Sequence, residues 1–449
     1  MAQPKTNLET IPILLSSVPS NLPESDKPAD HAPISRLPLP DWAACDPNIL
    51  RQWSPRLPTI NALYNHWKTH RVLHMVSPNS SGKSTLCTLL AAYLRHIYPN
   101  DKIIMTSSLA YSSLRGIARL QDVLKREGVE EDPLKAGHVW LVVDDSQETY
   151  ADKELWSWIK NVLPMAGEEG LRVLMVCEYG ALGDGIKGED IPVLRNEMCR
   201  IGMRATETVP IGVALSREEM EDMVVRYGQH PMGPKQQGFR FSEELVQWIW
   251  EWSGGHAGVV EALCKGLCEG LPEKDGGMIG KEDIHTAFPG GVGRCIVERK
   301  YHCLRGIPRD WHVYDNEEGM AVIEMCESYN LVVRNVSEMD AKEDEGLLKC
   351  WRRGCFEATV EGEEVRFRFV TKVHRMCAEY LLRWYAGDFA RDGAVMYLTK
   401  EECLGLLKKP VGDDGDIELQ AGRYVRARRR TSPGKTAESE EVQVAEGES

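Results

Sequence analysis

Residues 74–94 read HMVSPNSSGKSTLCTLLAAYL. The tripeptide at 82–84 completes the phosphate-binding pattern G-x-x-x-x-G-K-[ST], except that Ser77 replaces the first glycine. An apolar run at 71–76 precedes the loop, and leucines at helical spacing follow it over 86–97. The tripeptide alone is short enough to occur by chance. The strand, small-residue loop and helix around it are the setting that this pattern requires, so we predict a working phosphate site.

In that setting, backbone N–H groups and the positive end of a helix dipole surround the phosphates. We expect Lys83 to reach the β- and γ-phosphates and Ser84 to supply a hydroxyl to Mg²⁺, while Thr85 either caps or contacts the α-phosphate. Ser77 adds no bulk near the phosphates, so binding is predicted and hydrolysis is left open. The predicted ligand is ATP or ADP with Mg²⁺, and the predicted residues of the loop are Ser77, Asn79, Ser80, Ser81, Gly82, Lys83, Ser84 and Thr85.

A second signal lies about 60 residues further on, where an apolar run at 139–143 ends in Asp144 and Asp145. We predict that Asp144 holds Mg²⁺ together with Ser84, and that Asp145 is the catalytic residue that polarises the attacking water. Solvated or helix-capping acids at a strand end are the alternative. The hypothesis requires Lys83 and Asp144 to leave neighbouring strands and converge on one triphosphate–metal pocket.

Several apolar runs are continuous rather than alternating, which is typical of strands buried on both faces of a parallel sheet. The run at 171–177 ends in Cys177-Glu178, either of which is a candidate γ-phosphate sensor, with a solvent-facing strand end as the alternative. Three arginines near the last run are sensor or finger candidates, or else surface residues. The predicted strands are 70–77, 101–108, 139–143, 171–177 and 208–214, and the arginines are Arg195, Arg200 and Arg204.

The composition excludes some classes of protein. With 449 residues, 42% hydrophobic, the chain is long enough for two or three domains. A formal net charge of −14 argues against electrostatic binding of the chain as a whole to nucleic acid or to an anionic membrane. Thirteen scattered cysteines with no C-x-x-C indicate a reducing compartment. We expect an intracellular protein with no signal peptide and no transmembrane helix.

The chain divides by composition and periodicity. Helical patterns follow the sheet, among them a capping-box start at 216–219, and an alternating hairpin pattern at 356–370 precedes another helix. The tail carries a basic run at Arg423–Arg430, either a nuclear-import signal or a solvated segment. The predicted parts are an irregular or disordered Pro-rich arm (1–45), an α/β core (46–215), a helical lid (216–290), a winged-helix-like segment (291–390) and a largely disordered tail (391–449).

Taken in order, these motifs resemble a STAND-type P-loop ATPase, related to the AAA+ proteins and most like the ATPase module of fungal Crinkler-like proteins. The resemblance covers about 60–385 and rests on SPNSSGKST, VVDDS, VCEYG, WSGGHAGVVEAL, CLRGIP and FRFVTKVHRMCAEYLL. It implies an α/β P-loop NTPase three-layer sandwich with a parallel sheet ordered 5-1-4-3-2, and a lid and winged segment that clamp the nucleotide. It also places His256 beside the nucleotide, with Ala257 where the group has an adenine-contacting proline. A cap or packed side chain is the alternative for His256.

The leading functional hypothesis is a slowly hydrolysing ATP switch that passes its nucleotide state to an unknown protein partner, with self-association as a further prediction. A non-hydrolysing nucleotide-binding scaffold is the second hypothesis, favoured by Ser77 and Ala257. The third hypothesis is a nucleic-acid-binding protein that uses the winged segment and the Arg-rich tail. The net negative charge of the chain argues against it. The absence of a guanine-reading N-K-x-D segment at a strand end does not settle ATP against GTP.

Overall fold

The computed structural model describes most of the chain between Pro40 and Arg391. Residues 1–39 of the Pro-rich arm, the tail with Arg423–Arg430, and Arg195 lie outside the described residues, whereas Asp41–Ala44 at the end of the arm form a short helix instead of the predicted irregular chain. The described residues are 40–44, 51–107, 109, 113–182, 185–186, 191–194, 196–229, 238–271, 277–307, 317–328 and 331–391.

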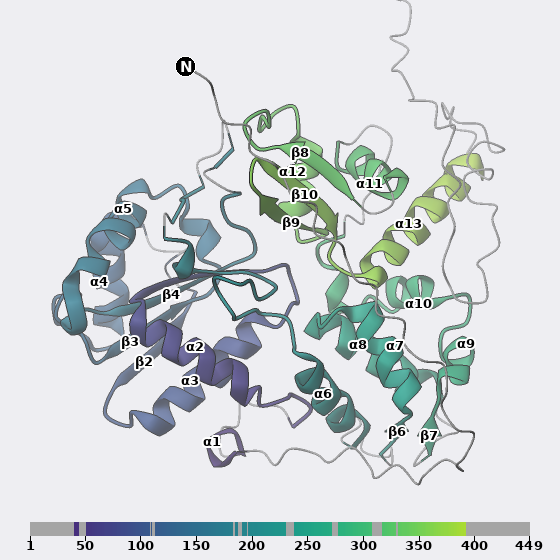
Figure 1. Ribbon diagram of the computed structural model, residues 1–449, viewed down its shortest axis with the longest axis horizontal. Helices are drawn as coiled ribbons and strands as arrows, with labels where there is room; N and C mark the ends of the chain where they lie inside the picture. The colour runs from purple at the N-terminus through teal and green to yellow at the C-terminus, as the bar shows by residue number, and fades with distance from the viewer. Residues whose placement is uncertain are drawn as a thin grey trace, which may run out of the picture. The chain divides into compact units, whose positions relative to one another are not determined.

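A five-stranded parallel sheet forms the centre of the first half (Figure 1). Its strands are β1 (Val72–Val76), β2 (Lys102–Thr106), β3 (Val139–Val143), β4 (Arg172–Cys177) and β5 (Arg200–Ile201). Their order, β2-β3-β4-β1-β5, is the predicted 5-1-4-3-2 read from the other edge. β1 and β3 both pair with β4. The prediction that the strand before the phosphate loop and the strand before Asp144 are neighbours is therefore wrong, because β4 lies between them.

Helices cover both faces of this sheet, which makes the predicted three-layer sandwich of a P-loop NTPase (Figure 1). The helices of this half are α1 (Asp41–Ala44), α2 (Leu57–Thr69), α3 (Lys83–Ile97), α4 (Gly116–Arg126) and α5 (Lys153–Asn161). Successive strand side chains point to opposite faces. Leu73 and Met75 therefore pack with α2 and α3, whereas Leu141 packs with α4 and α5 on the other face.

The predicted fifth strand at 208–214 is wrong. The structure forms β5 earlier, at Arg200–Ile201, and the later segment has no regular secondary structure. Pro210 has no N–H to donate to a ladder, which disfavours a strand there. The apolar pattern of this segment instead reflects burial against the face that carries α2 and α3. Its buried side chains are Val209, Ile211 and Val213.

The helical pattern after the sheet gives three main helices. The elements are α6 (Arg217–Gln229), β6 (Arg240–Phe241), α7 (Glu243–Ser253), α8 (Ala257–Gly270), β7 (Met278–Ile279) and α9 (Ile284–Ala287). The predicted capping box is present at the start of α6, since the Ser216 N–H donates to the Glu219 carboxylate at 3.0 Å and the Glu219 N–H donates to the Ser216 hydroxyl at 3.2 Å. Gly254, with φ 53°, ends α7 in the left-handed region.

The last described part contains the predicted hairpin together with a third strand that was not predicted. The elements are α10 (Val292–Glu298), α11 (Glu317–Glu327), β8 (Val332–Asn335), α12 (Glu345–Arg352), β9 (Phe356–Glu361), β10 (Glu364–Phe369) and α13 (Lys372–Arg391). The hairpin is β9 and β10, and the antiparallel order is β8-β10-β9. One apolar core joins this part to the helices before it. Among the described residues, no helix is both long and apolar enough to cross a bilayer.

Candidate functional site

The phosphate loop connects β1 to α3 and has the backbone shape that a phosphate cradle needs. Gly82 has φ 99° and Ser80 has φ 58°, both in the left-handed region. Gly82 is the residue before the first turn of α3, so the free N–H groups of that turn point into the loop. The buried hydroxyl of Ser81 has no hydrogen-bond partner among the described residues. An anion in this loop would satisfy both the N–H groups and this hydroxyl.

Ser77 does not need to be glycine. Its φ is not positive, so its backbone conformation is open to any residue. Its buried hydroxyl donates to the Met203 sulfur at 3.0 Å. The side chain is therefore hydrogen-bonded within the protein, and a serine at this position is compatible with the observed loop geometry.

Lys83 is buried beneath the loop. Its ammonium donates to the carbonyl oxygens of Ser77 at 2.6 Å and Pro78 at 2.8 Å. Burial lowers the pKa of the Lys83 ammonium, and the nearby carboxylates of Glu178 and Asp144 oppose this effect. The amine lies at the start of the loop, where it can exchange these carbonyls for a phosphate.

The two sequence motifs meet at the carboxyl edge of the sheet. The Ser84 hydroxyl donates to Asp144 Oδ2 at 2.7 Å, although β4 lies between their strands. The other oxygen, Oδ1, accepts from the N–H of Asp145 at 3.1 Å. Asp145 is exposed and has φ 54°, a conformation that aspartate tolerates better than most residues. The structure thus places the predicted metal and catalytic residues beside the loop.

The hydroxyl and carboxylate oxygens of Ser84 and Asp144 fit a Mg²⁺ site. Mg²⁺ is usually held by one or two carboxylates together with substrate phosphates and water. Among the described residues, no group of three or more His, Cys, Asp or Glu side chains could hold a metal by itself. The fit therefore depends on a phosphate ligand bound in the loop.

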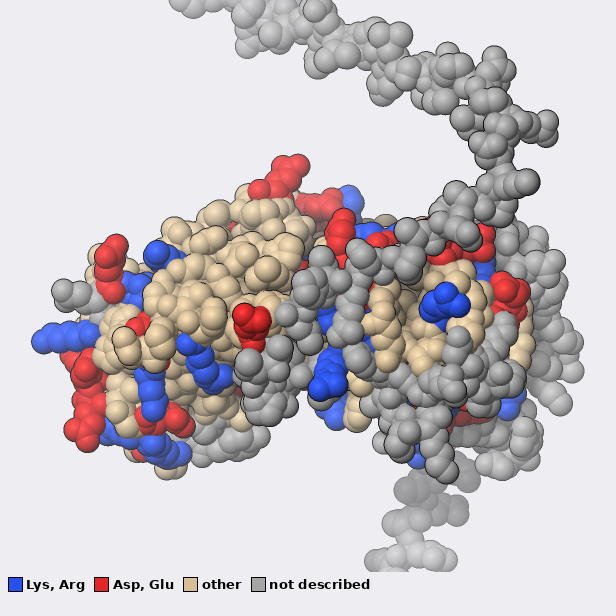
Figure 2. Space-filling view, turned by 90° about the horizontal axis from the view of Figure 1, so that it is seen from below, with Lys and Arg blue, Asp and Glu red and all other residues tan. Residues whose placement is uncertain are grey.

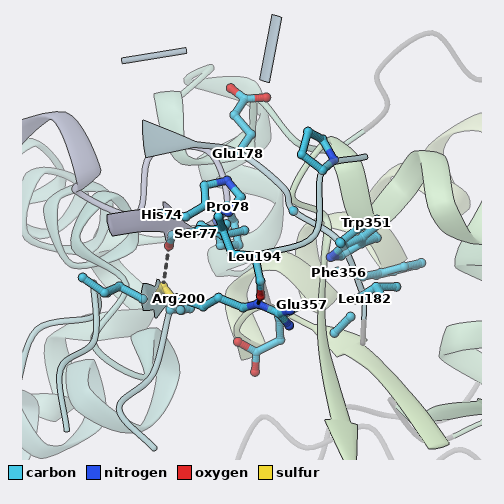
Figure 3. A pocket seen from close by; sticks show the side chains of 18 residues that line it. His74, Ser77, Pro78, Glu178, Leu182, Leu194, Arg200, Trp351, Phe356 and Glu357 are labelled. Carbon is cyan, nitrogen blue, oxygen red and sulfur yellow. Dashed lines mark hydrogen bonds between the residues drawn. The ribbon is translucent and has the colours of Figure 1, made fainter. Parts of the chain in front are cut away.

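Glu178 follows β4 directly beside the loop. A pocket of about 180 Å³ opens here, and Figure 3 shows Ser77 and Pro78 on one side of it and Trp351 and Phe356 on the other. Burial raises the pKa of the Glu178 carboxyl, and Lys83 opposes this effect.

Behind Glu178, a buried polar cluster joins the middle of β1, the end of β4 and the start of η1 (Ser146–Thr149). The thiol of Cys177 lies 3.2 Å from His74 Nε2 and 2.8 Å from the Ser146 hydroxyl. Burial raises the pKa of the Cys177 thiol to about 12 and lowers the pKa of His74 to about 3. Both groups are therefore neutral at physiological pH, and Cys177 is held inside the protein rather than presented to a ligand.

The N-terminus of α8 contacts the phosphate loop. His256 caps α8, because its Nδ1 accepts from the Val259 N–H at 3.3 Å. This assigns the proton to Nε2, which donates to the Asn79 carbonyl at 3.2 Å. Next to it, the Gly258 N–H donates to the Ser80 carbonyl at 2.9 Å. The capping alternative for His256 is thus observed, and direct contact with a nucleotide stays a prediction.

Two later segments hold the same two loop residues. The Ser80 hydroxyl donates to the His302 carbonyl at 2.9 Å, and the Asn79 amide donates to the Arg353 carbonyl at 3.3 Å. A Cβ at Gly354 would lie 2.9 Å from the Asn79 nitrogen, so only glycine allows this approach. Sequence reasoning missed these contacts, because a carbonyl that contacts a distant loop leaves no side-chain signature.

A buried ion pair, also missed, fastens the start of α6 to the segment before α2. Arg56 Nε donates to Glu219 at 3.0 Å, and the other guanidinium nitrogens donate to the carbonyls of Val213 and Ala214 at 2.9 and 3.0 Å. Arg56 has φ 50°, an uncommon conformation for a long side chain. These bonds fix the point at which the chain passes from the sheet to α6.

The arginine candidates have structural partners. Arg200 lies in β5, and its Nε donates to the Leu194 carbonyl at 2.6 Å. Arg204 contacts Glu357 at 3.4 Å and the Gly254 carbonyl at 3.2 Å. None of these hydrogen bonds joins Arg200 or Arg204 to the phosphate loop.

Comparison with solved structures finds likenesses at low sequence identity, three of which follow. The Walker-type ATPase PABY2304 of Pyrococcus abyssi is 10% identical with a TM-score of 0.36, covering 72% of this chain and 95% of that one. The Aeropyrum pernix ORC1 protein, solved with DNA, is 11% identical with a TM-score of 0.38, covering 76% and 94%. The Thermotoga maritima RuvB Holliday junction branch migration motor is 12% identical with a TM-score of 0.34, covering 70% and 90%.

No protein-family model and no curated protein matches the chain. The fold assignment therefore rests on the strand order and on the loop geometry described above.

Proposed function

We propose that the protein binds an adenine nucleotide with Mg²⁺ in the phosphate loop and acts as an intracellular nucleotide-dependent switch. The observation that carries the proposal is the 2.7 Å bond between Ser84 and Asp144, which joins the two motifs at one site. Lys83 supplies the positive charge for the phosphates, and the first turn of α3 supplies N–H donors.

The switch is supported by the contacts on Asn79 and Ser80. Segments at 256–258, 302 and 353–354 all touch these two loop residues. A phosphate that reshapes the loop changes these contacts, and a change in these segments alters the loop in return. The lid and the winged segment would pass this change to a protein partner or to a second copy of the chain.

Slow hydrolysis belongs to the same proposal. When bound, Mg²⁺ would neutralise the charge that develops on the phosphates. Asp145 is exposed beside the metal residue Asp144, where its carboxylate can orient a water. The narrower likeness to STAND proteins and to fungal Crinkler-like ATPases is part of this proposal, including the alternation between ADP and ATP.

The nucleic-acid hypothesis is less well supported. The arginines of the three-stranded sheet β8-β10-β9 are paired with carboxylates: Arg334 with Glu324, Arg366 with Glu361, and Arg368 with Glu357. On the face seen in Figure 2, acidic and basic side chains are interspersed over the described surface. Paired arginines release few counterions, so they contribute little to phosphate-backbone binding.

Binding of fluorescent ATP with Mg²⁺, followed by phosphate release, tests the proposal. We expect binding in the wild type, its loss in Lys83→Ala, and binding without release in Asp145→Asn. Binding without release in the wild type would favour the non-hydrolysing scaffold. Equal binding by the wild type and Lys83→Ala would contradict the nucleotide site.

A further inference from the structure

Glu178 adds a carboxylate to one end of the phosphate loop. The β1–β4 register pairs Val76 with Cys177, and the Ser77 N–H donates to the Cys177 carbonyl at 3.2 Å. Glu178 therefore follows alongside Ser77. The Lys83 ammonium is bonded to the carbonyl of that same residue at 2.6 Å.

This is the end of the loop that a third phosphate would occupy. The N–H groups at the start of α3 cradle the α- and β-phosphates, and the lysine of such a loop reaches the β- and γ-phosphates. Glu178 is also close enough to Lys83 for the two charges to interact. A γ-phosphate held by the Lys83 ammonium therefore also comes near the Glu178 carboxylate.

Glu178 is held in this position. Its N–H donates to the Gln147 side-chain oxygen at 3.3 Å, which fixes the backbone from which the carboxylate extends. The Asn79 side chain lies near enough to favour the charged form of that carboxylate. Asn79 is itself fixed by the Arg353 carbonyl at 3.3 Å. The Glu178 backbone and the neighbouring Asn79 side chain are therefore both positioned by hydrogen bonds within the protein.

We propose that Glu178 determines nucleotide preference: its carboxylate opposes the γ-phosphate, so the site binds a nucleoside diphosphate more tightly than a triphosphate. The proposal rests on the proposed function. Like charges repel strongly in a partly buried site, and the effect falls with distance, so the α- and β-phosphates are affected less.

Calorimetric titration with MgADP and MgATP tests the proposal. We expect the wild type to bind ADP about tenfold more tightly than ATP. Glu178→Gln should raise the affinity for ATP about tenfold and change the affinity for ADP less than about threefold. Glu148→Gln, which removes an exposed carboxylate from nearby η1 (Ser146–Thr149), is the matched control and should leave the ratio unchanged.

An unchanged or lower ATP affinity in Glu178→Gln would overturn the proposal. Glu178→Asp keeps the charge and should keep the ADP preference, which separates charge from shape if the Gln variant folds poorly. If the wild type binds neither nucleotide, or if Lys83→Ala binds as the wild type does, the proposed function itself fails. Nucleotide binding with no preference for ADP overturns only the role of Glu178.

Discussion

The contact between α8 and the phosphate loop can be broken by one methyl group. A Cβ at Gly258 would lie 2.6 Å from the Ser80 carbonyl oxygen and 2.9 Å from the Ser80 Cβ, so Gly258→Ala must push α8 and the loop apart. The bond from the Gly258 N–H to the same carbonyl, 2.9 Å long, is weakened as well.

The expected cost follows from three effects. Overpacking costs about 1–3 kcal/mol, and a lost hydrogen bond costs about 1 kcal/mol. Alanine in a helix is more favourable than glycine by up to about 1 kcal/mol, which offsets part of this cost. We therefore expect the contact to weaken by about 1–3 kcal/mol, which corresponds to about a 5- to 150-fold change in an equilibrium.

Hydrogen exchange of residues 79–85 and stopped-flow release of a fluorescent nucleotide measure this change. We expect faster loop exchange and an altered rate of nucleotide release in Gly258→Ala. Lys265→Ala changes the partly exposed side of the same helix and should alter neither measurement. A folded Gly258→Ala protein with wild-type exchange and release would refute the coupling.

Three further predictions concern the loop, the ion pair and pH. Ser77→Gly should leave nucleotide affinity within about threefold by calorimetry and lower the unfolding free energy by about 0.5–1 kcal/mol, because glycine adds freedom to the unfolded chain; a large gain in affinity would contradict the role given to Ser77. Glu219→Gln should cost about 3–5 kcal/mol in urea unfolding, because it leaves Arg56 buried without its charge partner; a loss under about 1 kcal/mol would oppose this. The buried His74 and His374 have pKa values of about 3 and about 4, so the unfolded chain binds their protons first and stability should fall as pH drops below about 6.5. Urea unfolding at successive pH values checks this, and His374→Asn should flatten the slope.

The sheet was largely predictable because its signals are local. Continuous apolar runs located four of the five strands, and the small-residue sequence before an amphipathic helix located the loop between β1 and α3. The fifth strand failed because buried apolar residues in an irregular segment give the same pattern as a buried strand. Pro210 and Gly212 are the two residues in it that disfavour a strand.

The contacts around the loop could not be predicted in the same way. Those of Gly258, His302 and Arg353 involve backbone groups, whose partners depend on how distant segments pack. The ion pair of Arg56 and Glu219 joins positions 163 residues apart, and nothing near either residue indicates the other. Sequence periodicity reports which side chains are buried, but it does not report what covers them.

Metal binding linked to the nucleotide shows whether Ser84 and Asp144 act as one site. Mn²⁺ in place of Mg²⁺ can be followed by electron paramagnetic resonance, with and without ADP. We predict that ADP raises Mn²⁺ affinity in the wild type and that Asp144→Asn reduces this rise at least about tenfold, because Asp144 and Ser84 form one site. An Asp144→Asn protein that binds Mn²⁺ and ADP as the wild type does would contradict the claim.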